Sequence, residues 1–162
     1  MPLNNQHSFE ENWDFSESNF AKIGDIIKQN ADVFLEFRKA NYEQDTKQAT
    51  DMVIDIQGTT VAVRVRRPNC KFRDLTLRAK TGYNGKTEID KIREGFGDWY
   101  LYAWEDSPGV INEWMLIDLD KLRKSELLKL ERFQSNGDGT GFYWYKQSEL
   151  NQCGCLLRSD KK

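Results

Sequence analysis

Apolar and polar residues alternate with a period of two from Asp51 to Arg67, and this alternation is typical of β-strands. A two-residue turn at residues 57–58 would make the segment a hairpin. The predicted cross-strand pairs are Ile54 with Val61, Met52 with Val63, and Asp51 with Arg64. One face then carries Met52, Ile54, Ile56, Val61, Val63 and Val65, and we expect it to face the core. The other face carries Asp51, Asp55, Arg64 and Arg66. It is either a solvated, salt-bridged surface or the floor of a site that handles phosphate.

Apolar residues recur at helical spacing in three other segments. They predict a first helix over roughly 16–29, a second that Thr87 caps and Gly95 ends, and a third over roughly 119–130. Asp14 and Glu17 would form a capping box for the first helix. The expected buried residues of these helices are Phe20, Ile23, Ile27, Ile89, Ile92, Phe96, Leu119, Leu122, Leu127 and Leu130.

Short apolar runs predict further strands at 33–37, 75–78, 99–104, 114–117 and 142–145. The runs 99–104 and 114–117 are apolar on both faces, as expected for central strands, and we assign their aromatic residues to the core. Residues 40–50 are predicted to form a loop and 136–141 a tight turn. We predict a loose leader at 1–15, a single domain at 16–150 and a flexible tail at 151–162. The element order indicates an α+β fold with a central mixed sheet flanked by helices.

The composition indicates a protein with one hydrophobic core and argues against membrane and zinc-binding classes. The chain has 162 residues, of which 38% are hydrophobic, and this suffices for one core without disulfides. No segment approaches a membrane span in length, and the N-terminus has no apolar run of the signal-peptide kind, so we expect a cytoplasmic protein. The chain has three cysteines and a single histidine, His7, which argues against a Cys/His zinc site and a histidine-dependent nucleophile.

Cationic residues are concentrated between Arg64 and Lys86, where Asp74 is the only acidic residue. Because the whole chain has a net charge of −2, this local excess indicates a phosphate-contacting patch; the alternative is an ordinary basic surface balanced by the acidic ends. The cations are Arg64, Arg66, Arg67, Lys71, Arg73, Arg78, Lys80 and Lys86. Glu88 and Lys91 lie one helical turn apart and either face the hairpin or form a surface pair. Tyr83 is either a loop aromatic or placed to stack on a base.

The order helix, strand, hairpin, helix, strand resembles the core of the PD-(D/E)XK nuclease-like superfamily. In that superfamily an Asp opens the second core strand and a (D/E)-x-K tripeptide ends the third. Here Asp51 stands in the first place and Arg64-Val65-Arg66 in the second. Over roughly residues 15–145 the chain is also similar to an uncharacterised group of phage and prophage proteins. The matching segments are 61–67, 86–88, 91–92, 95–99, 116–119 and 138–140.

The resemblance implies a magnesium-dependent phosphodiesterase or endonuclease that acts on nucleic acid, with DNA favoured over RNA. It implies catalytic roles for Asp51, Arg66 and Glu88, and a metal site at Asp51 and Asp55. The implied binding residues are Arg64, Arg67, Arg73, Arg78, Lys86 and Lys91. The chain departs from the motif, since Arg64 replaces the second carboxylate and Arg66 the lysine. A guanidinium repels a metal ion and stays protonated, so a degenerate nuclease that binds without cutting also fits.

Two hypotheses of other classes stay open. The first is a non-enzymatic phage protein that inhibits a host defence or replication factor, with its acidic ends and aromatic-rich strands as the interface. The second is a protein that binds a small phosphorylated ligand through its arginine cluster.

Overall fold

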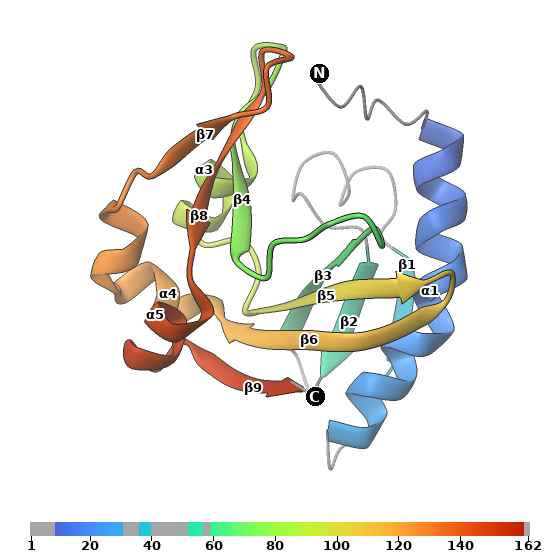
Figure 1. Ribbon diagram of the computed structural model, residues 1–162. Coiled ribbons are helices and arrows are strands. Elements are labelled where there is room, and N and C mark those ends of the chain that lie inside the picture. Colours follow the sequence, from blue (N-terminus) through green and yellow to red (C-terminus); the bar gives the residue numbers. More distant parts are fainter. Residues whose placement is uncertain (1–8, 31–35, 40–51, 57–58, 161–162) are drawn as a thin grey trace.

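The computed structural model describes residues 9–30, 36–39, 52–56 and 59–160, which form two β-sheets and several helices (Figure 1). The larger sheet has six strands in the order β1-β2-β3-β5-β6-β9. Its strands are β1 (Glu36–Lys39), β2 (Met52–Ile56), β3 (Thr59–Arg66), β5 (Trp99–Ser107), β6 (Val110–Asp118) and β9 (Leu156–Asp160). Strands β3 and β5 are parallel and the other neighbouring pairs are antiparallel, so the sheet is mixed.

A second, antiparallel sheet has the order β4-β8-β7. Its strands are β4 (Leu75–Lys80), β7 (Phe133–Ser135) and β8 (Gly141–Tyr145). The helical elements are α1 (Phe9–Asn30), α3 (Glu88–Arg93), α4 (Leu119–Lys124), the 3-10 helix η1 (Glu126–Lys129) and α5 (Gln147–Gln152). The second sheet lies with α3, α4 and α5 on the opposite side of the molecule from α1 (Figure 1). These elements confirm the predicted α+β class with a mixed sheet.

The predicted hairpin is present as β2 and β3, and Ile54 lies opposite Val61 as expected. The core face of β3 is also confirmed, because Val61 and Val63 are buried with Ile23 and Ile27 of α1. Alternation along β3 and β5 sends the intervening side chains to the other face, where a second core forms. There Tyr100 and Tyr102 of β5 pack with residues of β4, α3 and α4: Leu75, Leu77, Ile89, Ile92, Leu119 and Leu122.

Helix α1 begins at Phe9, inside the segment predicted as a leader. The capping box at Asp14 and Glu17 is therefore wrong, because both residues lie within the helix. Glu10 and Glu11 occupy the first turn instead, where carboxylates interact favourably with the helix dipole. The N-terminal part of α1 is tied to the end of β3, since Arg67 donates to the Asn12 side chain at 3.1 Å.

Predictions for the third helix, for Leu130 and for the C-terminal tail are wrong. Ser125 divides the third helix into α4 and η1, because its hydroxyl accepts from the Leu127 N–H and so begins a new helical segment. Leu128 is buried where Leu130 was expected. The predicted flexible tail contains the last turn of α5 and β9, which pairs with β6 and so completes the larger sheet. The predicted strand at 33–37 is observed as β1 from Glu36, and residues 31–35 and 40–50 lie outside the described segments.

Thr87 and Gly95 act as predicted at the ends of α3. The Thr87 hydroxyl accepts from the Asp90 N–H in a capping box, and Gly95 follows the helix with a φ of 98°. Phe96 lies beyond the helix and is exposed, contrary to prediction, because the chain turns away at Gly95. Within the described residues, no helix has both the length and the apolar character that a membrane crossing requires.

Candidate functional site

The structure gathers a group of polar side chains between the larger sheet and β4, which we call the arginine cluster: Arg64, Arg66, Glu88, Tyr100 and Tyr102. The parallel pairing of β3 with β5 places Arg64 opposite Tyr102 and Arg66 opposite Trp104. Alternation puts these side chains on the face away from α1. The predicted charged face of β3 is therefore enclosed between layers of the protein, since both arginines are only partly exposed.

Glu88 is the buried carboxylate of this cluster, with 4% of its surface exposed. Its Oε1 accepts a 2.5 Å hydrogen bond from the Tyr100 hydroxyl and lies 3.6 Å from Arg64 Nη2. Its Oε2 accepts from the backbone N–H of Arg78 at 2.9 Å. Burial and the neighbouring Glu88 charge hold the pKa of Tyr100 well above its usual value, so this phenol stays a donor. The predicted contact between Glu88 and the hairpin is present.

Arg66 has a different environment. The pKa of its guanidinium is raised chiefly by the neighbouring Tyr102, whereas burial and the Arg64 charge lower it. Tyr102 in turn shares a hydrogen bond of 2.7 Å with Thr76 Oγ1 on β4. Among the described residues, no carboxylate pairs with Arg66. A largely enclosed guanidinium without a carboxylate is suited to an anionic ligand that brings its own oxygens.

The described donor set does not fit the magnesium ion that the nuclease resemblance implies. Magnesium takes hard oxygen ligands, and both Glu88 oxygens already accept hydrogen bonds. Arg64 lies beside the same carboxylate and would repel a divalent cation. No group of three or more His, Cys, Asp or Glu suited to a metal occurs within the described segments. Asp51, the predicted metal ligand, lies outside them.

Asp55 is not brought to the arginine cluster. Its backbone lies opposite Thr60, at the end of the hairpin where Asp98 accepts from the Thr60 N–H and hydroxyl. Thr60 precedes Arg64 by four residues, which corresponds to roughly 13 Å along a strand. The register agrees with the predicted shared face but separates Asp55 from the arginines along it, because alternation sets the face of a residue and not its position along the strand.

Three predicted binding cations have structural partners. Arg67 lies over the Phe15 ring of α1, at 4.3 Å from its centre. Lys86 pairs with Glu94 at 2.7 Å on the surface. Lys91 is buried in α3 and is also engaged in an interaction. Arg78 has an exposed side chain, and its backbone holds Glu88.

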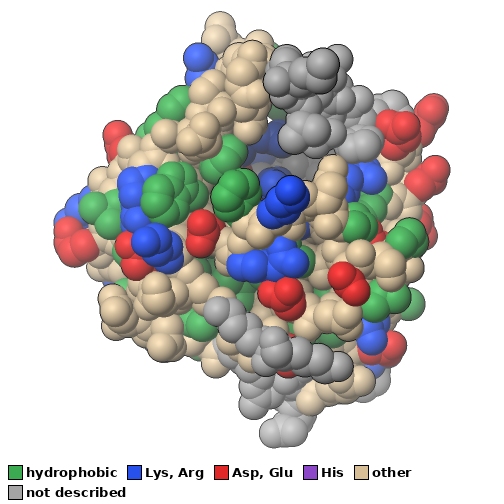
Figure 2. Space-filling view, in the orientation of Figure 1, with side chains coloured by type: hydrophobic (Ala, Val, Ile, Leu, Met, Phe, Trp, Pro, Cys, Tyr) green, Lys and Arg blue, Asp and Glu red, His purple; other side chains and the backbone are tan. Residues whose placement is uncertain are grey.

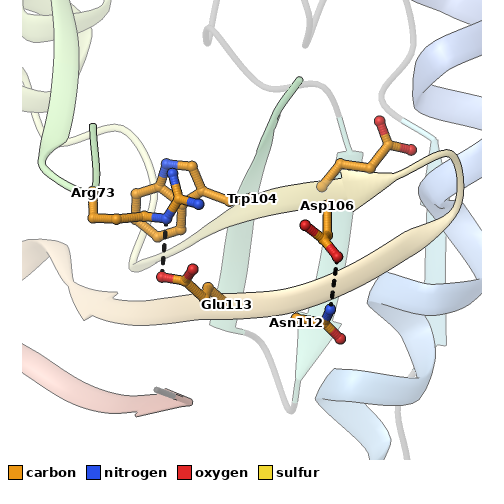
Figure 3. Close-up of a pocket in the computed structure, with 6 residues that line it drawn as sticks. Arg73, Trp104, Asp106, Asn112 and Glu113 are labelled. Atoms are coloured by element: carbon orange, nitrogen blue, oxygen red, sulfur yellow. Dashed lines mark hydrogen bonds and ion pairs between the residues drawn. The ribbon is translucent and has the colours of Figure 1, made fainter. Parts of the chain in front are cut away.

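Arg73 lines an open hollow of about 180 Å³ (Figure 3). Its guanidinium donates to Glu113 at 2.9 Å and stands over the Trp104 ring at 5.6 Å. The other lining residues are Glu105, Asp106 and Asn112. Trp104 also contacts Tyr102 edge to face at 5.1 Å, so the hollow and the arginine cluster are linked through one row of aromatic rings. Lys and Arg side chains gather near the middle of this face of the molecule (Figure 2).

The sequence pattern does not predict that the hydroxyl groups of Tyr100 and Tyr102 belong to the site. Both residues lie in an apolar run and were assigned to the core, which is where their rings lie. Their alternation with Leu101 and Ala103 placed them on one face, and parallel pairing of that strand with β3 would have brought them beside the arginines. No protein-family model, curated protein or solved structure matches this chain, so the arginine cluster is interpreted from its own geometry.

Proposed function

We propose that this protein is a phage-type, nuclease-like protein that binds nucleic acid through phosphate contacts at the arginine cluster. The observation that carries the proposal is the partly enclosed Arg66 guanidinium, for which the described residues supply no carboxylate. A phosphodiester provides two oxygens that match the two parallel N–H donors of a guanidinium. DNA is the favoured partner, as the resemblance to nucleases implies.

The arrangement of elements supports the nuclease-like part of the proposal. The observed order is α1, β1, the β2–β3 hairpin, β4, α3 and β5, which contains the order expected for the PD-(D/E)XK core with β4 inserted before α3. Arg64 and Arg66 stand at the end of the third strand of that order, where the (D/E)-x-K tripeptide is expected. With arginines in this place, Arg66 still supplies a positive charge for a phosphate. The carboxylate that would bind a metal ion is absent, because Arg64 replaces it.

The mechanism that follows is binding without metal-dependent cleavage. Arg66 stays protonated and cannot act as a base. Glu88 pairs with Arg64, and the negative charge of the one offsets the positive charge of the other. The positive charge of Arg66 is then available to a phosphate of the ligand. Phosphate contacts of this kind position a strand without reading its sequence, and their strength falls with rising salt.

The first experiment titrates the purified protein into labelled single- and double-stranded DNA and RNA, at low and high salt and with and without magnesium. We expect salt-sensitive binding, and we expect Arg66→Ala to weaken it about tenfold or more and to reduce the salt slope by about one. Arg66→Lys keeps the positive charge but loses the paired N–H donors of the guanidinium. Its affinity for nucleic acid should therefore lie between that of the unaltered protein and that of Arg66→Ala.

Lys124→Ala is the matched control, because it removes one cation from an exposed pair with Asp120 on α4. It should leave binding unchanged. Arg64→Ala is less informative, since it leaves the buried Glu88 carboxylate without its cation. Equal loss in Lys124→Ala and Arg66→Ala, or no binding to any nucleic acid, would overturn the proposal and favour a protein partner. Magnesium-dependent cutting that disappears in Asp51→Ala would establish a nuclease instead.

A further inference from the structure

The outer face of the second sheet carries aromatic and cationic side chains together. Cross-strand pairs in an antiparallel sheet point to the same side, and Leu75 and Leu77 with Tyr145 fill the inner, buried side. The other side carries the alternate residues Thr76, Arg78, Phe142 and Trp144. Of these, Thr76 bonds to the Tyr102 hydroxyl and the Trp144 ring lies under Arg132 at 4.6 Å, so Arg78 is the exposed cation of this side. Figure 2 shows hydrophobic and Lys/Arg side chains side by side, with some Asp/Glu side chains among them, on the face of the molecule that β4 and β8 occupy.

Two fully projecting aromatic residues flank this face along the chain. Phe72 comes just before β4 and Tyr83 just after it, and each has 73% of its surface exposed. Phe72 is fixed through its backbone, because its carbonyl accepts from the Trp104 indole at 2.9 Å. Tyr83 is held in the same way, since its carbonyl accepts from the Thr81 hydroxyl. Exposed rings on fixed backbones are suited to stacking on a ligand, and the Tyr83 ring is further positioned by its packing beside Gly85.

The charges of this face are complementary to phosphate. Lys71 adjoins Phe72, and Arg78 and Lys80 lie on β4 between the two exposed rings. In the described part of the chain, none of these three cations has a carboxylate within 4.0 Å. Of the nearby carboxylates, Glu149 pairs with Arg132, whereas Asp138 accepts from the Thr140 hydroxyl and interacts electrostatically with Arg78.

We propose that β4 and β8 form a track for single-stranded nucleic acid, with Phe72 and Tyr83 stacking on bases and Lys71, Arg78 and Lys80 contacting phosphates. The inference rests on the proposed function and names its substrate class. Unpaired bases present their faces to aromatic rings, whereas the bases of a duplex are stacked on one another. Strand β4 adjoins the arginine cluster, because Thr76 bonds to Tyr102 and the Arg78 N–H bonds to Glu88. Its six residues span roughly 20 Å, enough for several nucleotides.

The test compares binding of labelled oligothymidine and oligouridine, each about 15 nucleotides long, with binding of a DNA duplex. We expect tighter binding to the single strands. Phe72→Ala and Tyr83→Ala should each weaken single-strand binding about tenfold and leave duplex binding unchanged. Tyr83→Trp should keep the affinity, and its indole fluorescence should be quenched when the oligonucleotide binds.

Phe96→Ala is the matched control, since Phe96 is also an exposed aromatic residue but follows α3, where its carbonyl accepts from Arg123 of α4. It should bind like the unaltered protein. Tighter binding to the duplex, or full single-strand affinity in both alanine variants, would overturn the track. If Arg66→Ala still weakened binding in that case, the proposed function would stand without the track. If no nucleic acid binds, the track and the proposed function fail together, and a protein surface is the remaining partner for the exposed rings.

Discussion

At the scale of single residues, Glu88 decides whether the arginine cluster is a stable part of the fold. Its carboxylate is enclosed and is held by a phenol, a backbone N–H and a guanidinium from three different strands. A buried charge of this kind is tolerated only when it is fully paired. The cluster is therefore a connected set in which loss of one partner leaves another without compensation.

We predict that Glu88→Ala lowers the free energy of unfolding by about 3–5 kcal/mol, because it removes the ion pair with Arg64 and the acceptor of both the Arg78 N–H and the Tyr100 hydroxyl. Tyr100→Phe removes a single donor and should cost about 1–2 kcal/mol. Urea unfolding of both variants measures the difference. Equal, small effects would mean that water already satisfies these groups in the folded protein.

At the scale of elements, the second sheet depends on a close approach between β7 and β8. Gly141 begins β8 next to Ser135, and a Cβ atom at this position would meet the Phe133 ring at 2.3 Å and the Gln134 carbonyl at 2.8 Å. The ring can turn aside, but the carbonyl belongs to the backbone of β7. Only glycine therefore permits this pairing without displacement of a strand.

We predict that Gly141→Ala destabilises the protein by about 1–3 kcal/mol, the usual range for overpacking. Gly137→Ala is a useful comparison, since it has open space around it but a φ of 83°, so it tests backbone strain without a clash. Thermal unfolding followed by circular dichroism compares the two. A Gly141→Ala protein as stable as the parent would show that β7 moves freely against β8.

At the scale of the whole molecule, three tyrosines join the two sheets within one core: Tyr100, Tyr102 and Tyr145. Burial raises the pKa of each phenol, that of Tyr145 to about 12. A raised pKa in the folded state means that the stability these groups contribute is fully present below the unfolded value of about 10. It is lost as the pH rises from there through the folded values.

We therefore predict that the melting temperature falls steeply above about pH 10, together with a late, cooperative rise in tyrosinate absorbance. The measurement is a set of melts and absorbance readings from neutral to strongly alkaline pH. Ionisation of Tyr100, Tyr102 and Tyr145 near pH 10 in a protein that stays folded would contradict the core described here.

Much of the fold follows from local pattern, whereas the candidate site depends on long-range pairing. The hairpin, the central strands and the Thr87 cap were predictable because alternation and capping act over a few residues. Tyr102 and Thr76 are brought together only by the packing of one sheet on another, which no spacing encodes. Strand β9 is short and weakly patterned, and only its pairing with β6 defines it.

The position of β9 has a consequence for folding during synthesis. Residues 156–160 occupy the edge of the larger sheet beside β6, although β6 itself ends at Asp118. While a ribosome is still adding the intervening residues, the emerging chain presents β6 with one unpaired edge. Unpaired edges recruit other strands, so during this interval the nascent protein is exposed to aggregation through β6.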